Sequence, residues 1–142
     1  MQRREFLSWL LKAAGTTLGL GGLAALPYLY HSRQEGPLRY IKAADEEKIP
    51  RRGVRQIDFS FDGMARKVFL VRNGTDFFVL SPVCSHLGCL VNWNYLKHEF
   101  DCPCHGGRYD ISGRVIGGPP PKPLTRLPYE IKKGSLYVGM RT

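Results

Sequence analysis

Acidic residues are scarce in this sequence. There are 12 Asp and Glu against 21 Lys and Arg, so the formal net charge is +9. Long basic runs are lacking as well. Residues 51–142 hold fourteen of the basic and seven of the acidic residues, and no run of Lys or Arg there exceeds two. Proteins that bind nucleic acid usually carry a basic stripe or cluster on one face. No such stripe is visible in this sequence, so we expect no nucleic-acid partner. The excess charge predicts a surface that faces anionic lipid head groups or an acidic partner.

Helical periodicity is lacking after residue 50, which argues against a helical domain. Short apolar runs are instead separated by turn residues, as in VFLVRNGTDFFVL (68–80), where Asn73-Gly74 predicts a hairpin. Further turns are predicted at residues 110–113 (DISG), 133–134 (KG) and 117–124 (GGPPPKPL), the last of which cannot join a strand ladder. Residues 51–142 are therefore predicted to form a small all-β domain of short antiparallel strands.

Charge is lacking between residues 13 and 30. A helix of eighteen residues rises about 27 Å, close to the roughly 30 Å of a bilayer's hydrocarbon layer. Several glycines and Pro27 make a poor helix in water but are common in membrane segments. Arg3-Arg4, placed just before this stretch, resembles the twin-arginine export signal. We predict that residues 1–30 are an export signal and a membrane anchor.

A small-residue cleavage pattern of the A-x-A kind is lacking where the apolar segment ends. The segment ends in LPYLY (26–30), and tyrosines suit a membrane interface. We therefore expect an uncleaved single-pass anchor in a bacterial cytoplasmic membrane, with the N-terminus inside and the β domain on the outer face. Residues 31–50 are polar and unpatterned, and they are predicted to be a flexible tether. A short amphipathic helix that caps the domain is the alternative.

Cysteine is rare: all four lie in CSHLGC (84–89) and CPCHGG (102–107), together with two of the four histidines. Two disulfides would suit an exported domain but would leave both histidines without a role. One zinc ion could take two thiolates and two imidazoles. The C-x-H spacing is tighter than in usual zinc knuckles, however, and zinc would leave two cysteines over.

A [2Fe–2S] cluster with two cysteines on one iron and two histidines on the other, together with one disulfide, gives a role to every cysteine and histidine of the two boxes. Each box then supplies one thiolate and one imidazole, namely Cys84 with His86 and Cys102 with His105. Cys89 and Cys104 are left to form a disulfide, which is permitted outside the cytoplasm.

The two boxes, followed by GGPPPKPL, resemble the Rieske iron–sulfur subunits of quinol–cytochrome c reductase (cytochrome bc-type) complexes. The resemblance covers nearly the whole chain. It implies a Rieske-type β domain over 51–142, with the cluster-binding part at about 82–124. It also implies one [2Fe–2S] cluster, a cytochrome b-type subunit and a c-type haem subunit as partners, and a tether on which the domain swings between quinol and haem.

The resemblance also implies residue roles. Cys84 and Cys102 match the ligands of the buried iron. His86 and His105 match the ligands of the outer, reduced iron, and one of them takes the proton when quinol gives up its electron. Leu87 matches a residue that shields the cluster.

Three further positions match family residues around the cluster. Residues 118–121, including Pro119, match a shielding loop. Tyr109 matches a tyrosine whose hydroxyl bonds the sulfur of a ligand cysteine. Gly107 departs from the higher-potential members, in which a serine hydroxyl bonds a cluster sulfide. Losing that donor implies a lower potential, which suits menaquinol.

Three other functions compete with this one. The Rieske small subunit of a periplasmic molybdenum oxidase, such as arsenite oxidase, shares the export signal and the extra cysteines. A soluble Rieske ferredoxin or oxygenase domain usually lacks both. A structural zinc or disulfide module is the alternative without redox chemistry.

Overall fold

The computed structural model describes residues 5–8, 11–12, 15–16 and 36–141. Leu38–Met140 forms one compact unit, and Met1–Pro37 belongs to a separate one. The described residues before residue 17 are helical, and no helix in the described part of the chain is long and apolar enough to cross a membrane. Arg3, Arg4 and nearly all of the predicted apolar span lie outside the described residues.

The described chain from residue 36 onward contains eleven strands and one short 3-10 helix. In chain order they are β1 (Leu38–Asp45), η1 (Glu46–Lys48), β2 (Gly53–Phe61), β3 (Met64–Asn73), β4 (Asp76–Leu80), β5 (Asn92–Asn94), β6 (Glu99–Asp101), β7 (Arg108–Tyr109), β8 (Val115–Gly117), β9 (Arg126–Leu127), β10 (Tyr129–Lys132) and β11 (Ser135–Arg141).

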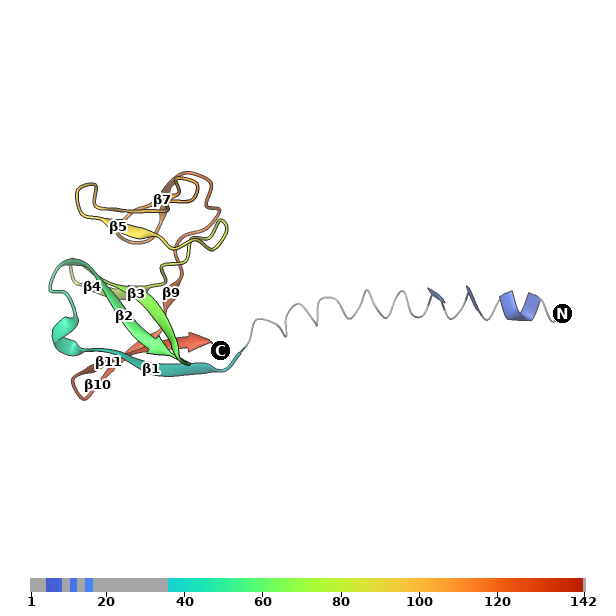
Figure 1. Cartoon of the computed structure of the whole chain (residues 1–142), viewed down its shortest axis with the longest axis horizontal. Coiled ribbons are helices and arrows are strands. Elements are labelled where there is room, and N and C mark those ends of the chain that lie inside the picture. Colours follow the sequence, from blue (N-terminus) through green and yellow to red (C-terminus); the bar gives the residue numbers. More distant parts are fainter. Residues whose placement is uncertain (1–4, 9–10, 13–14, 17–35, 142) are drawn as a thin grey trace. The chain divides into compact units, whose positions relative to one another are not determined.

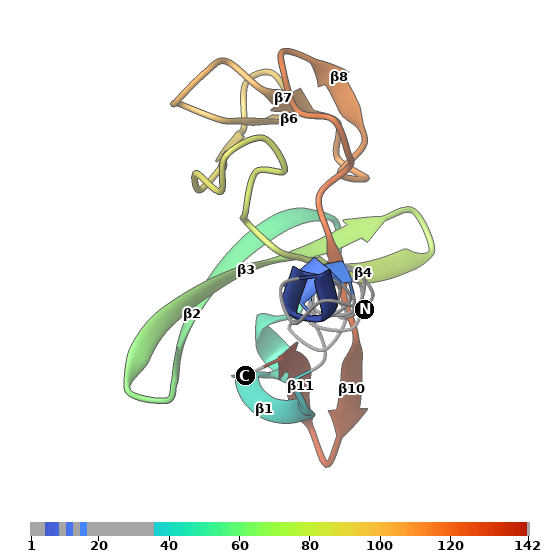
Figure 2. The ribbon, with the colours of Figure 1, turned by 90° about the vertical axis from the view of Figure 1, so that its right-hand side faces the viewer.

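These strands form three sheets with the orders β1-β11-β10, β2-β3-β4-β9 and β5-β6-β7-β8. The pairings among strands β2 to β11 are all antiparallel, so the prediction of an all-β antiparallel domain is confirmed. The β2-β3-β4-β9 sheet lies between the other two (Figures 1 and 2).

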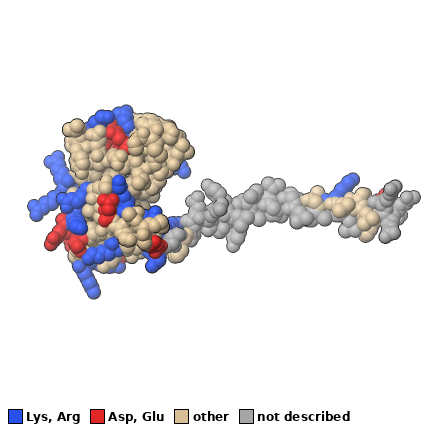
Figure 3. Space-filling view, viewed as in Figure 1, with Lys and Arg blue, Asp and Glu red and all other residues tan. Residues whose placement is uncertain are grey.

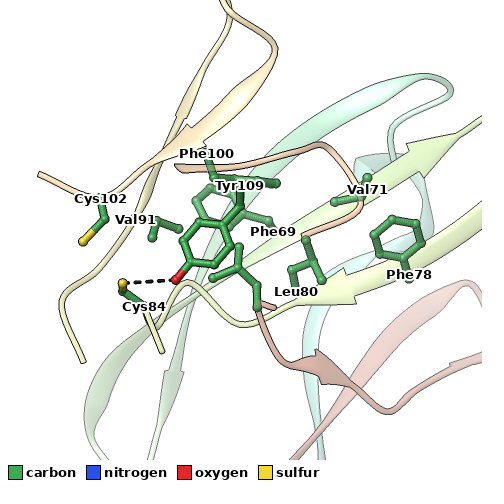
Figure 4. Packing of buried hydrophobic residues seen from close by; sticks show 10 residues of the cluster. Phe69, Val71, Phe78, Leu80, Cys84, Val91, Phe100, Cys102 and Tyr109 are labelled. Atoms are coloured by element: carbon green, nitrogen blue, oxygen red, sulfur yellow. Dashed lines mark hydrogen bonds between the residues drawn. The ribbon is translucent and has the colours of Figure 1, made fainter. Parts of the chain in front are cut away.

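Strand β3 connects the two hydrophobic cores because it is buried on both faces. Alternate side chains of a strand point to opposite faces. Val68 and Leu70 accordingly lie in the core shared with β11, whereas Phe69 and Val71 lie in the core under the β5–β8 sheet. All four are fully buried. The second core holds the cluster-box cysteines Cys84 and Cys102, so the site is built directly on this central strand (Figure 4).

The predicted turns are confirmed. Asn73 pairs with Asp76 across the β3–β4 turn, where Gly74 has a φ of 61°. Lys132 pairs with Ser135 across the β10–β11 turn. Residues 118–125, after β8, join no ladder, but Gly117, which was predicted to stay outside any ladder, is the last residue of β8 and pairs with Arg108. The Asp-Gly turn between β2 and β3 was not predicted, although its residue pair is a strong hairpin signal.

The predicted tether is wrong from residue 38 onward. Leu38–Asp45 is strand β1, which pairs beside β11. Ala44 is buried in the core, and the backbone nitrogen of Glu46 donates to the carbonyl of Gly134 at 2.9 Å. Ala44 is the one fully buried residue of β1, so this edge strand carries little apolar alternation that sequence analysis could detect.

Candidate metal centre

The two cysteine boxes form loops with the same backbone pattern. In the first loop, Cys84 N donates to Cys89 O at 2.8 Å and Gly88 N to Cys84 O at 3.0 Å. In the second loop, Cys102 N donates to Gly107 O at 2.7 Å and Gly106 N to Cys102 O at 3.1 Å. Gly88 and Gly106 are at corresponding positions of the two loops. Their φ values are 77° and 68°, a backbone region that glycine adopts without strain. Each box therefore forms one tight turn around its first cysteine.

Short strands hold these loops at one end of the β5–β8 sheet. An isolated bridge between Val83 and Leu90 closes the first loop. The second loop connects β6 to β7, where Asp101 pairs with Arg108. Cys84 and Cys102 are only 2% and 4% exposed, and Figure 4 shows their sulfur atoms pointing toward one another. The first cysteine of each loop is thus directed inward.

A disulfide between Cys89 and Cys104 joins the two loops, which confirms the predicted pairing. The sulfur atoms of Cys89, Cys102 and Cys104 lie within 4.8 Å of one another. That trio is not a metal site, since two of its sulfurs are already bonded together. The free thiols are Cys84 and Cys102.

The two histidines of the boxes lie outside the thiols. His86 is half-buried and His105 is exposed, with ring centroids 4.9 Å apart and planes at 90°. Nδ1 of His86 is buried and has no hydrogen-bond partner among the described residues. A buried polar atom without a partner is costly, and a metal bond would satisfy it. The structure thus buries the thiols of Cys84 and Cys102, whereas the rings of His86 and His105, which lie close to each other, are more exposed.

Hydrogen bonds favour the thiolate of Cys84, the form that binds metals. Burial raises its pKa, but the Tyr109 hydroxyl, the His86 backbone and the Cys102 side chain outweigh this and lower it. The Tyr109 hydroxyl lies 3.1 Å from Cys84 Sγ, as the resemblance implied. Two buried thiols and two outer imidazoles are the donor set of a Rieske cluster, so the residues fit that group.

The proline-rich loop after β8 lies against the second cysteine loop, as the close approach of Gly118 to Gly106 and Gly107 shows. Pro119 is exposed, whereas Pro120 is buried. Leu87 is 70% exposed, beside the histidines. Ser85 was not predicted to take part in the site. Its hydroxyl donates to Lys122 O at 2.6 Å and accepts from Lys122 N at 3.2 Å. No sequence signal marks Ser85 as the link between the loops.

The surface charges are not evenly spread. On the face seen in Figure 3, most Lys and Arg side chains lie on the lower part of the β domain with Asp and Glu among them, and the upper part, where β5 and β7 lie, is largely uncharged. Several charged residues form ion pairs, such as Arg114 with Asp110 at 3.0 Å and Arg108 with Glu99 at 3.6 Å.

Comparison with known proteins points to one family. The family model described as "Rieske [2Fe-2S] domain" matches residues 40–128. The menaquinol:cytochrome c reductase iron–sulfur subunit of Bacillus subtilis is 31% identical, with 98% of this chain and 92% of the relative covered. Its counterpart from Geobacillus thermodenitrificans is 35% identical, with 96% and 90% covered.

A solved structure supports the fold. The plasma membrane Rieske protein of Synechocystis PCC 6803 has a TM-score of 0.53 at 24% identity, covering 69% of this chain and 97% of that one. The match over more than half the chain and the full-length relatives agree with the paired loops. The chain therefore belongs to the Rieske [2Fe–2S] family and carries one such cluster.

Proposed function

We propose that this protein is the iron–sulfur subunit of a quinol–cytochrome c reductase complex. It takes an electron from a quinol and passes it to a c-type haem. The observation that carries this proposal is the similarity to two reductase subunits over almost the whole of both chains. Both relatives are named menaquinol:cytochrome c reductase subunits, which supports menaquinol as the substrate.

In this proposal Cys84 and Cys102 would bind one iron of the cluster, and His86, through its unpartnered Nδ1, would bind the other together with His105. The burial of the thiols and the outward position of the imidazoles support this assignment. The cluster, when bound, accepts one electron. A thiolate pair on one iron and neutral imidazoles on the other raise the potential above that of an all-cysteine cluster.

In this proposal His86, His105 and Leu87 take part in quinol oxidation. If Nδ1 of His86 bound iron, its Nε2 would be free to accept a hydrogen bond and then the proton of a quinol hydroxyl. His105 is exposed and serves as the other proton acceptor. The exposed Leu87 provides an apolar contact that keeps water from the histidines when the domain docks on a cytochrome b-type subunit.

The chain's N-terminal part anchors the domain. Residues 1–30 form the twin-arginine signal and a single membrane span, with the N-terminus inside. The cluster domain then lies on the outer face of a bacterial cytoplasmic membrane. Since β1 begins at Leu38, the tether is restricted to about residues 31–37 and the folded domain to 38–142. The cluster-binding part remains at about 82–124.

Purification of the native complex tests this function. We expect the chain to copurify with a b-type and a c-type cytochrome, and its cluster to be reduced when a menaquinol analogue is added. A complex that contains a molybdenum subunit and no b-type haem would instead identify the small subunit of a molybdenum oxidase. The full-length similarity to reductase subunits favours the first outcome.

A further inference from the structure

Pro120 differs from its neighbours in the proline-rich loop. Residues 118, 119 and 121 are exposed, whereas Pro120 is buried. The loop backbone lies directly on the second cysteine loop: a Cβ at Gly118 would come within 2.5 Å of Gly106 O and 2.8 Å of Gly107 Cα. This contact requires glycine at 118, where φ is also +82°. The loop is thus pressed against the cluster box, and Pro120 is its inward residue.

The ring of Pro120 occupies the space that a side chain at residue 107 would need. Gly107 is buried, and a Cβ built on it would lie 2.6 Å from Pro120 Cγ and 3.1 Å from Pro120 Cδ. The same point is 3.4 Å from Cβ of Cys102. Real Cβ atoms do not approach a carbon to 2.6 Å, and a proline ring is fixed to its own backbone and moves little. A side chain at 107 would therefore have to displace the loop.

This contact changes the expected effect of residue 107 on the cluster potential. The resemblance implied that serine at 107 would simply add a hydrogen-bond donor to the cluster. In this chain the position beside Cys102 is filled by an apolar ring that has no donor. Hydrogen bonds to cluster sulfurs raise the potential, because they favour the more negative reduced state. A ring that excludes both a hydroxyl and water keeps the potential low.

We propose that Pro120 is a positioning residue of the cluster pocket and forms a size-matched pair with Gly107. The potential is then set by both residues together: a hydroxyl at 107 can reach the cluster only when residue 120 is small. The proposal rests on the proposed role of Cys102 as a cluster ligand. It assigns to Pro120 a role that the sequence did not single out among three consecutive prolines.

A double-mutant cycle on the full-length, detergent-purified protein tests the pair. The variants are Gly107→Ser, Pro120→Ala and the two combined. Two quantities are measured: the midpoint potential of the cluster and the hydrogen exchange of the loop's backbone amides at Gly118, Lys122 and Leu124, since its prolines have none. Neither measurement needs quinol or a partner subunit. A failed coupling is therefore distinguishable from a failed reductase function, which the native complex tests.

We expect Gly107→Ser alone to speed exchange in the proline-rich loop several-fold with little change in potential. Adding Pro120→Ala should restore loop protection and raise the equilibrium constant for cluster reduction about tenfold, equivalent to about 59 mV for one electron. Pro119→Ala is the matched control, since Pro119 is exposed. Combined with Gly107→Ser, it should restore nothing.

Additive effects of the two substitutions on both quantities would overturn the proposal, because independent sites show no coupling. If Gly107→Ser assembles no cluster, the proposal requires that Pro120→Ala restores assembly and that Pro119→Ala does not. A combined variant that still lacks the cluster would also contradict it.

Discussion

The hydroxyl oxygen of Tyr109 lies 3.1 Å from Cys84 Sγ and 3.2 Å from the backbone nitrogen of Ser85. A backbone N–H can only donate, so the tyrosine oxygen accepts from Ser85 and its own hydrogen is available to the sulfur. Tyr109 is fully buried, and β7 places it opposite Phe100 on β6. Figure 4 marks this contact, in which Tyr109 is the donor when Cys84 is a thiolate, since a thiolate has no hydrogen to give.

Tyr109→Phe should lower the midpoint potential of the cluster without removing it. The ring still fills the core, but the sulfur loses a donor that favours the reduced state. If the differential loss is about 1–2 kcal/mol, the potential falls by roughly 40–90 mV. Redox titration of the visible spectrum measures this shift. Tyr95→Phe, at a tyrosine 69% exposed, is the control. An equal shift in both variants, or none in Tyr109→Phe, would contradict the role given to this bond.

Removal of one proposed ligand should abolish the cluster. Cys102→Ala and His105→Ala each leave an iron without one of its protein ligands, and the electron paramagnetic resonance signal of the reduced cluster should disappear together with bound iron. His98→Ala is the matched histidine control and should keep both. A variant of Cys102 or His105 that retained the [2Fe–2S] signal would show that the ligands are wrongly assigned.

The two cysteine boxes could be recognised from the sequence because each consists of six consecutive residues. Each box is a single turn, so six consecutive residues carry both proposed ligands and the disulfide cysteine. Hairpins were predictable for the same reason, through residue pairs such as Asn73-Gly74.

Features that depend on distant contacts could not be predicted. Strand β1 is held at a sheet edge by a partner about ninety residues away and has one fully buried side chain. Three consecutive prolines look alike in sequence, and only the packing of the loop on Gly107 distinguishes the buried Pro120 from the exposed Pro119. The contact of Ser85 with Lys122 likewise spans 37 positions.

Asp110 should make stability depend on pH. Burial raises its pKa, but hydrogen bonds from Ser112 and Arg114 outweigh this and lower it below the usual 3.8. A group whose pKa is lowered by folding stabilises the protein above its unfolded pKa, and this contribution is lost as the pH falls through the folded pKa. Asp110→Asn should therefore cost about 1–2 kcal/mol of unfolding free energy near pH 6.

The difference between wild type and Asp110→Asn should shrink as the pH falls below about 4. Denaturant titrations of both proteins across this range measure it. Asp76→Asn, at an exposed residue, is the matched control. A cost of Asp110→Asn that stayed constant down to pH 3 would mean that the charge of the carboxylate is not what stabilises the turn.

Replacement of Arg3-Arg4 by Lys-Lys should stop export while the cluster still assembles. These residues lie outside the described part of the chain. The reasoning is that the cluster is inserted before transport, so the folded domain needs the twin-arginine route. Cell fractionation with detection of the [2Fe–2S] signal follows both outcomes. Normal membrane placement of the Lys-Lys variant, with the domain on the outer face, would contradict the proposed signal.

Loss of the Cys89–Cys104 disulfide should destabilise the site without removing the cluster ligands. The bond closes a loop with a sequence separation of 15. In the chain-entropy account, a closed loop of this size is worth about 3 kcal/mol. Cys89→Ala, Cys104→Ala and the double variant should assemble the cluster but lose its visible absorption at a lower temperature than wild type.

The three variants are each other's controls, because breaking one bond from either side, or from both, removes the same constraint. Their melting temperatures should agree when all the proteins are compared with the cluster in the same oxidation state. If the double variant melted well below both single variants, the two sulfurs would have separate roles. A single variant as stable as wild type would show that the bond between the loops does not hold the cluster site together.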